Sequence, residues 1–246
     1  MLALALVAPP SSSGAADHLR FLSRLPQVPC RDDIAPFAQR HFALTSNAAE
    51  IGVFRGNFSS HNLRHWKGRY FAVDAWAFRP EDARNRGGHT NNDKNFRSPV
   101  QNAQNYEAAR SAMAFAGDRV QLVRNFSVNA AATFEDGFFD WLYIDALHSE
   151  PAVVKDLNAW WPKLRPGGLM SGDDYGGTEH DSPMLSVKRW ERYFGPALHC
   201  CRWGVIKAVH DFAAKHGLVV HVTFMHDCYR YAAWYIVKPL CWPDCH

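Results

Sequence analysis

The sequence has no stretch of about 18 consecutive apolar residues, the length that a helix needs to cross a bilayer, and it has no long run of lysine or arginine. The formal net charge over 246 residues is only +3. We therefore expect neither a transmembrane helix nor a surface specialised for nucleic acid or membranes. Hydrophobic residues make up 47% and charged residues 21%, which predicts a packed globular core rather than disorder.

Cysteine is infrequent, and its pattern matches no common metal signature. Six cysteines are present, and the C-terminal pair, Cys241 and Cys245, has a spacing that fits no usual zinc site. We expect structural cysteines, paired or buried, with a C-terminal metal site as the weaker alternative. Residues 1–16 predict a flexible leader, favoured over the remnant of a signal or anchor segment. A cytoplasmic location is favoured, although six cysteines also allow the secretory pathway.

Apolar strand-like runs alternate with helical stretches from residue 48 onward. Several runs are continuously apolar, which is typical of strands covered on both faces in a parallel sheet flanked by helices. Expected helices lie at 149–161 and 203–216, and two short helices are expected within 17–42. We predict one α/β domain over residues 17–246, with strands at 48–53, 69–74, 119–123, 139–145, 168–173, 218–224 and 232–237.

The sharpest local motif joins the end of the first strand to a helix. Gly52 would permit a tight turn and a close ligand, and Gly56 would begin the helix. The spacing is Gly-x-x-x-Gly, which lacks the three glycines of the usual dinucleotide fingerprint. Glu50 could accept hydrogen bonds from a cationic amino group, and Asp74, at the next strand end, could bind both hydroxyls of a ribose.

Three further carboxylates follow the fourth and fifth strands. Asp145 ends one strand, and Asp173 and Asp174 end the other, so they are expected at one edge of the sheet. Converging carboxylates repel each other unless a cation neutralises them. Because Mg²⁺ prefers oxygen ligands, these three residues are candidate ligands for Mg²⁺ or another divalent cation. In the competing interpretation, Asp173 and Asp174 only cap the following loop or contact a cofactor.

These motifs, in this order, resemble class I S-adenosylmethionine-dependent methyltransferases, and in particular methyltransferase family 24. The resemblance covers most of the chain, roughly residues 48–239, and includes the runs 139–145, 156–168 and 172–175. It implies a Rossmann-like sheet of seven strands whose last strand is antiparallel. It also implies S-adenosylmethionine as cofactor and a methyl acceptor of small size, with no nucleic-acid or membrane partner evident and a homo-oligomer allowed.

The resemblance implies particular cofactor contacts. Glu50 and Gly52 would line the methionine end, with Gly56 opening the next helix, and Asp74 would bind the ribose. The segment after the third strand would run alongside the adenine ring of the cofactor. This segment contains Asn125, Phe126 and Ser127. Trp76, just beyond the ribose carboxylate, is a candidate to touch the adenine or to border the pocket. Asp145, at the end of the fourth strand, is also a candidate cofactor contact.

The carboxylates also resemble the metal site of O-methyltransferases of the catechol and macrolide-sugar types. That match implies Asp145, Asp173 and Asp174 as metal ligands, and O-methylation of a small-molecule or sugar hydroxyl. His148 falls where catechol-type enzymes have a lysine base, so it is a candidate general base. The departure from lysine leaves a surface role open for His148, and Asp145 could be the base in a site without metal.

Two long polar segments, 77–99 and 175–202, follow strand ends and are expected to shape the acceptor pocket. Their basic residues would suit an anionic or sugar-like acceptor, although solvated surface charge is the favoured interpretation: Arg79, Arg84, Arg86, Lys188 and Arg189. Three alternatives to a metal-assisted enzyme stay open. They are a metal-independent methyltransferase that uses His148, an NAD-type oxidoreductase, and a non-catalytic binding module.

Overall fold

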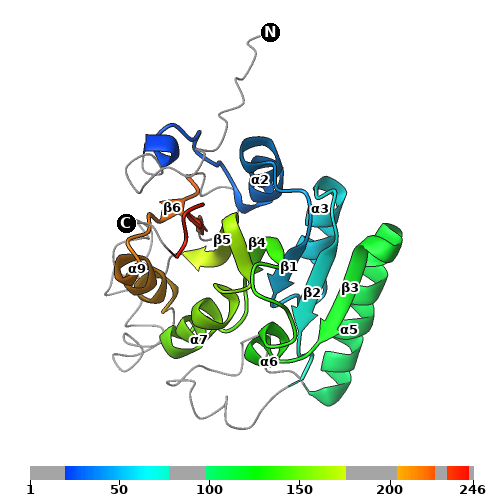
Figure 1. Cartoon of the computed structure of the whole chain (residues 1–246). Coiled ribbons are helices and arrows are strands. Elements are labelled where there is room, and N and C mark those ends of the chain that lie inside the picture. Colours follow the sequence, from blue (N-terminus) through cyan, green and yellow to red (C-terminus); the bar gives the residue numbers. More distant parts are fainter. Residues whose placement is uncertain (1–19, 78–97, 176–203, 225–231, 244–246) are drawn as a thin grey trace.

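The computed structural model of the chain describes residues 20–77, 98–175, 204–224 and 232–243. They form one seven-stranded sheet of order β3-β2-β1-β4-β5-β7-β6 (Figure 1). Neighbouring strands from β3 to β5 pair in parallel, whereas β7 pairs antiparallel with both β5 and β6. The strands are β1 (Ala48–Ile51), β2 (Tyr70–Asp74), β3 (Val120–Arg124), β4 (Phe139–Ile144), β5 (Leu164–Tyr175), β6 (His221–Val222) and β7 (Ala232–Val237).

Helices cover both faces of the sheet, so each face has its own core. One core packs α2 (Ile34–Phe42), α3 (Asn57–His65) and α5 (Pro99–Met113) against the sheet, and the short turn η1 (Arg31–Asp33) precedes α2. The other core packs α6 (Ser127–Ala131), α7 (Glu150–Trp160) and α9 (Val205–Lys215). The turn η2 (Ala114–Arg119) leads from α5 into β3. This doubly covered sheet confirms the predicted Rossmann-like α/β class.

Local sequence explains where several elements begin and end. Ser98 accepts a hydrogen bond from the Gln101 backbone N–H at 3.3 Å, and Pro99 supplies a pre-set backbone angle, so α5 begins there. Gly217 adopts a φ of +63° just after α9, as the predicted stop signal requires. β7 has the predicted bounds. Its six residues are all buried, as expected of a continuously apolar strand that helices cover on both faces of the sheet.

The expectation for the sixth strand was too long, since only His221 and Val222 pair. In the part of the chain that the structure describes, β6 is an edge strand that pairs only with β7. β5 begins at Leu164 rather than residue 168. The leader at 1–16, most of both long segments and the basic residues named within them lie outside the described residues.

No helix among the described residues is long and apolar enough to span a bilayer. Cys241 is disulfide-bonded, as expected of a structural cysteine. Cys30, directly before the turn η1, is buried. Cys200, Cys201, Cys228 and Cys245 lie outside the described residues.

Candidate active site

The carboxyl ends of the central strands lie side by side, as predicted. Glu50 of β1 is in register with Tyr143 of β4, and Tyr143 is in register with Ser171 of β5. In parallel strands, partners in register point to the same face, and residues two further along return to that face. Glu50, Tyr143, Asp145 and Asp173 therefore belong to one face of the sheet, near its carboxyl edge.

Gly52 lies where the backbones at the ends of β1 and β4 nearly touch. Its φ is +97°, and a Cβ added there would lie 1.9 Å from the Asp145 carbonyl oxygen. The backbone N–H of Gly52 donates to Val73 O at 2.8 Å, and that of Asp145 donates to Ile51 O at 2.7 Å. Only glycine fits this turn, because both the backbone angle and the space exclude a side chain.

Gly56 has the predicted place directly before α3, with a φ of +77°. A Cβ there would lie 3.0 Å from Cα of Ala109 in α5. The glycine thus permits the close packing of α5 against the turn that enters α3. Between the two glycines, Phe54 takes a left-handed φ of +53°, a backbone conformation that residues with a side chain rarely adopt.

Asp74 fixes the loop between β1 and α3. Its carboxylate accepts backbone hydrogen bonds from Val53 at 3.0 Å, from Phe54 at 2.8 Å and from Trp76 at 2.7 Å. Burial raises the pKa of Asp74, while the three N–H donors oppose that change by stabilising the anion. A carboxylate has about four acceptor sites, so Asp74 can hold this loop and still accept from a ribose hydroxyl.

Trp76 closes this corner of the site. It is buried and has a φ of +40°, and its indole N–H donates to the Phe54 carbonyl at 2.7 Å. Its ring packs edge-on against Tyr106 of α5. The structure therefore places Trp76 beside the loop that Asp74 organises.

Glu50 is a buried carboxyl group on β1. One oxygen accepts from the Ser59 hydroxyl at 2.7 Å and from the Tyr70 hydroxyl at 2.8 Å. Burial raises the pKa of Glu50 from 4.5 to about 8, with the Asp145 carboxylate adding to the increase and Arg31 opposing it. The group is thus held in place by two hydroxyls and is poised to gain or lose a proton near neutral pH.

The raised pKa of Glu50 gives a first prediction about stability. The folded protein binds this proton more tightly than the unfolded chain, so the free energy of unfolding falls as the pH rises from 4.5 to about 8. Glu50→Gln removes the titration. We expect the variant to lose this slope and to be more stable than wild type at pH 9 by roughly 1–3 kcal/mol. Chemical denaturation at pH 5, 7 and 9 measures it, and parallel curves for the two proteins would refute the assignment.

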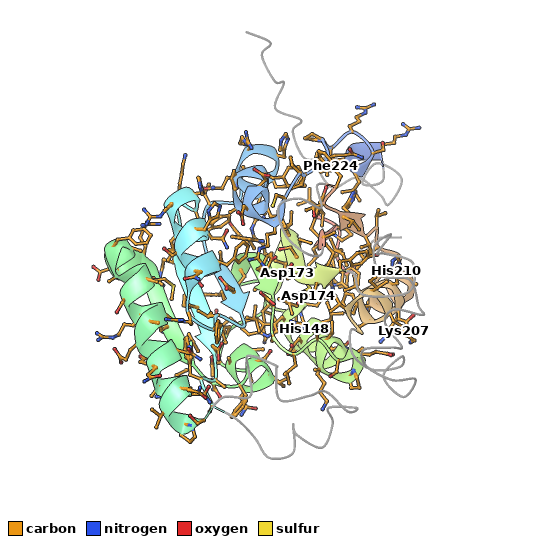
Figure 2. All side chains as sticks on the ribbon, turned by 180° about the vertical axis from the view of Figure 1, so that it is seen from behind. His148, Asp173, Asp174, Lys207, His210 and Phe224 are labelled. Carbon is orange, nitrogen blue, oxygen red and sulfur yellow. The ribbon has the colours of Figure 1, made fainter. Side chains whose placement is uncertain are left out.

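Asp145, His148 and Asp174 form a compact cluster at the ends of β4 and β5. Imidazole Nε2 of His148 lies 3.3 Å from Asp145 Oδ1 and 3.0 Å from Asp174 Oδ2. One ligand atom from each residue falls within 4.8 Å of the others. The three side chains are 17–26% exposed, so the cluster can be reached from solvent. Figure 2 labels His148 and Asp174 near one another at the carboxyl edge of the sheet.

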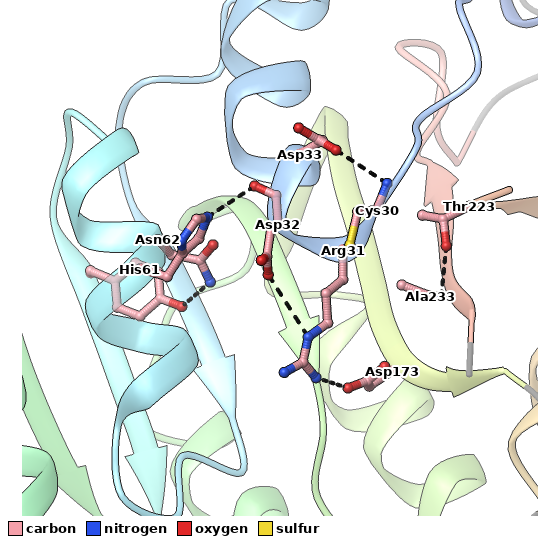
Figure 3. A network of polar contacts seen from close by, with 10 residues as sticks. Cys30, Arg31, Asp32, Asp33, His61, Asn62, Asp173, Thr223 and Ala233 are labelled. Carbon is pink, nitrogen blue, oxygen red and sulfur yellow. Dashed lines mark hydrogen bonds and ion pairs between the residues drawn. The ribbon is translucent and has the colours of Figure 1, made fainter. Parts of the chain in front are cut away.

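Asp173 does not join this cluster, contrary to its predicted role as a metal ligand. It forms a buried ion pair with Arg31, a residue 142 positions earlier in the chain (Figure 3). Asp174 instead turns toward His148, with a left-handed φ of +55° that breaks the regular alternation of the strand. Burial and the nearby Asp145 carboxylate raise the pKa of Asp173, and the Arg31 guanidinium opposes this. His148 therefore takes the place in the cluster that was expected for Asp173.

The segment expected to pass the adenine follows β3 beside β2. The Asn125 backbone N–H donates to Asp74 O at 3.0 Å, and the Asn125 side-chain oxygen accepts from the Phe126 N–H at 2.9 Å. The hydroxyl of Ser127 points elsewhere: it donates to the buried Asp156 of α7 and accepts from the Trp160 indole at 2.9 Å. Ser127 thus anchors α6 to α7 through its side chain, so its backbone alone can face a ligand.

Sequence reasoning missed two residues of this region. Arg31 lies in a short polar turn with no motif around it, so nothing local marks it as a partner of the fifth strand. Asp156 lies in a helix that the sequence predicts, and burial raises its pKa to about 6 although Ser127 donates to it. An acidic residue on the apolar side of a helix is the one available signal for such a buried partner.

Comparisons with known proteins identify the family and the fold. The profile of a methyltransferase domain, that of methyltransferase family 24, matches residues 49–175, slightly more than half of the chain. No match was found among curated proteins.

Several solved structures share the fold. A protein assigned as a caffeoyl-CoA O-methyltransferase from Staphylococcus aureus superposes with a TM-score of 0.54 at 15% identity, covering 92% of this chain and 93% of that one. An O-methyltransferase from Bacillus cereus in complex with SAH gives 0.51 at 14% identity, covering 95% and 93%. At such identities the likeness concerns the fold. The match of the family profile goes further: this chain belongs to methyltransferase family 24, and is an S-adenosylmethionine-dependent methyltransferase of class I.

Proposed function

We propose that this enzyme transfers a methyl group from S-adenosylmethionine to a hydroxyl oxygen of a small molecule or sugar, assisted by a divalent cation at Asp145, His148 and Asp174. The single observation that carries the proposal is the cluster itself, at the strand ends beside Gly52. Two carboxylate oxygens and one imidazole nitrogen form a donor set that suits Mn²⁺ or Zn²⁺, whereas Mg²⁺, which prefers oxygen ligands, would be held by the two carboxylates. The titles of the two structural neighbours name O-methyltransferases, which supports oxygen as the acceptor atom.

The residues present also fit the cofactor. The turn at Gly52 leaves bare backbone at the rim, where a ligand can approach closely. Glu50 and Asp74 supply carboxylates for the ammonium and the ribose, and Trp76 borders the pocket. Asn125 and Phe126, with the backbone of Ser127, would line the adenine. When bound, S-adenosylmethionine supplies a methyl group on a sulfonium, which is open to attack by an oxygen nucleophile.

The cluster would orient and activate the acceptor. A cation held there lowers the pKa of a hydroxyl that coordinates it. Asp145 and Asp174 carry the cluster's negative charge, and His148 lies between them at 3.3 Å and 3.0 Å. In the second candidate function, no metal is bound and His148 takes the proton of the acceptor hydroxyl as the general base. The same contacts of His148 favour that candidate, so a chelator must decide between the two.

Methyl-transfer screening tests the proposal directly. Purified enzyme is incubated with labelled S-adenosylmethionine and with phenols, sugars or small hydroxy acids, with Mg²⁺, Mn²⁺ or EDTA. We expect transfer to a hydroxyl compound that EDTA abolishes and added cation restores. Full activity in EDTA would exclude the metal-assisted form and leave His148 as the base. Transfer only to nitrogen or sulfur acceptors would refute O-methylation.

Asp74→Ala should weaken cofactor binding. Loss of hydrogen bonds to a charged group predicts a fall in S-adenosylmethionine affinity of about 10- to 100-fold. The variant also releases three backbone N–H groups, so its melting temperature is measured alongside. Asp118→Ala, at an exposed carboxylate, is the matched control and should bind like wild type. Equal affinity in wild type and Asp74→Ala, by calorimetry, would contradict the ribose assignment.

A further inference from the structure

Arg31 connects the N-terminal turn η1 to the edge of the sheet where the candidate site lies. Its Nη1 forms the ion pair with Asp173 (Figure 3). Its guanidinium carbon lies 4.6 Å from the centre of the Phe58 ring. The side chain is only 12% exposed. Phe58 belongs to the first turn of α3, and its ring contacts that of Tyr143 in β4. Arg31 is thus a buried cation, held by an acid and by an aromatic ring.

The charge of Arg31 acts on the same face of the sheet as Glu50. The guanidinium opposes the rise in pKa that burial causes at Glu50. Asp173, the ion-pair partner of Arg31, and Tyr143, whose ring contacts Phe58, lie on the same face of the sheet as Glu50. A carboxyl group, Glu50, and a cation, Arg31, therefore lie on one face of the sheet near its carboxyl edge.

The cofactor's amino-acid end carries an ammonium and a carboxylate, so its recognition needs groups of both charges. Glu50 provides for the ammonium. We propose that Arg31 binds the carboxylate of the cofactor's amino-acid end, an assignment that rests on the proposed function. A guanidinium offers five N–H donors in a planar fork that matches a carboxylate. Asp173 acts as the positioning residue that keeps this fork at the rim, which gives it a role other than ligating metal.

The experiment compares two ligands that differ only in the carboxylate. S-adenosylmethionine and its decarboxylated analogue are titrated by calorimetry into wild type, Arg31→Met and Arg31→Lys. We expect Arg31→Met to lower the affinity for S-adenosylmethionine about 10- to 100-fold, and to change the affinity for the analogue by less than about twofold. Arg31→Lys should recover part of the difference, because it keeps the charge but not the fork. A merely structural role would weaken both ligands equally, and that result would overturn the proposal.

Arg31→Met leaves the Asp173 carboxylate buried without this partner, which destabilises the fold. The double variant Arg31→Met with Asp173→Asn removes both charges and avoids that problem, and Asp173→Asn alone is its control. Asp173→Asn should still prefer S-adenosylmethionine over the analogue, and the double variant should not. If wild type binds both ligands equally, the role of Arg31 fails while the proposed function stands. If wild type binds neither, the cofactor assignment and the role of Arg31 both fail.

Discussion

Replacing Gly52 by alanine is expected to destabilise the protein by about 3–5 kcal/mol and to abolish cofactor binding. The new Cβ would lie 1.9 Å from the Asp145 carbonyl oxygen, 2.4 Å from the Asp145 carbonyl carbon and 2.8 Å from Cα of Ala146. All three are backbone atoms, so no side chain can rotate away. The ends of β1 and β4 would have to separate, and the acidic groups that the site needs would move with them.

The matched control for this substitution is Gly217→Ala. Gly217 has a similar left-handed backbone, with a φ of +63°, but an added Cβ there meets nothing within 4 Å. It should cost about 1 kcal/mol from backbone strain alone. Thermal and chemical denaturation of both variants measure the two losses of stability. The difference between them is the cost of the steric clash at Gly52, beyond the backbone strain that both variants share. Equal losses of stability in the two variants would mean that β1 and β4 do not approach each other closely.

Asp145→Asn is expected to lower kcat by a factor of about 10² to 10³ while changing affinity for S-adenosylmethionine by less than about threefold. The substitution keeps the shape of the side chain but removes one of the two carboxylates that flank His148. A cation would be held more weakly, and a protonated His148 would lose one of its two ion-pair partners. Either form of the proposed chemistry therefore loses turnover.

Asp136→Asn is the control for Asp145→Asn. Asp136 is an exposed carboxylate that pairs with Lys163, in the loop before β4 rather than after it. Steady-state kinetics and calorimetry on both variants should show unchanged values for Asp136→Asn. Wild-type turnover in Asp145→Asn would show that Asp145 takes no part in the methyl-transfer step. A large loss of cofactor affinity would mean that Asp145 acts mainly in binding.

Much of the fold follows from runs of residues in the sequence. The continuous apolar stretches at 139–145 and 232–237 predict buried strands, and β4 and β7 occupy them with at most one residue of difference. Asp74 and Gly52 were predictable as strand-end residues, because each directly follows a mostly apolar run. β6 was overestimated, because an apolar run does not reveal that it lies at the edge of the sheet.

The details of the site depended on contacts that no local pattern contains. Asp173 and Asp174 are chemically identical neighbours, so the sequence cannot tell which one faces His148. The answer comes from the left-handed backbone at Asp174 and from Arg31, far away in the chain. In the same way, the hydroxyl of Ser127 is taken by Asp156, which only the packing of α6 against α7 brings near.

The most direct test of the account is a calorimetric titration of the wild-type enzyme with S-adenosylmethionine and, separately, with NAD. If the acidic ends of β1 and β2 hold a sulfonium donor, S-adenosylmethionine binds with one site per chain and NAD gives no heat beyond dilution. Binding of NAD with no response to S-adenosylmethionine would contradict the central claim.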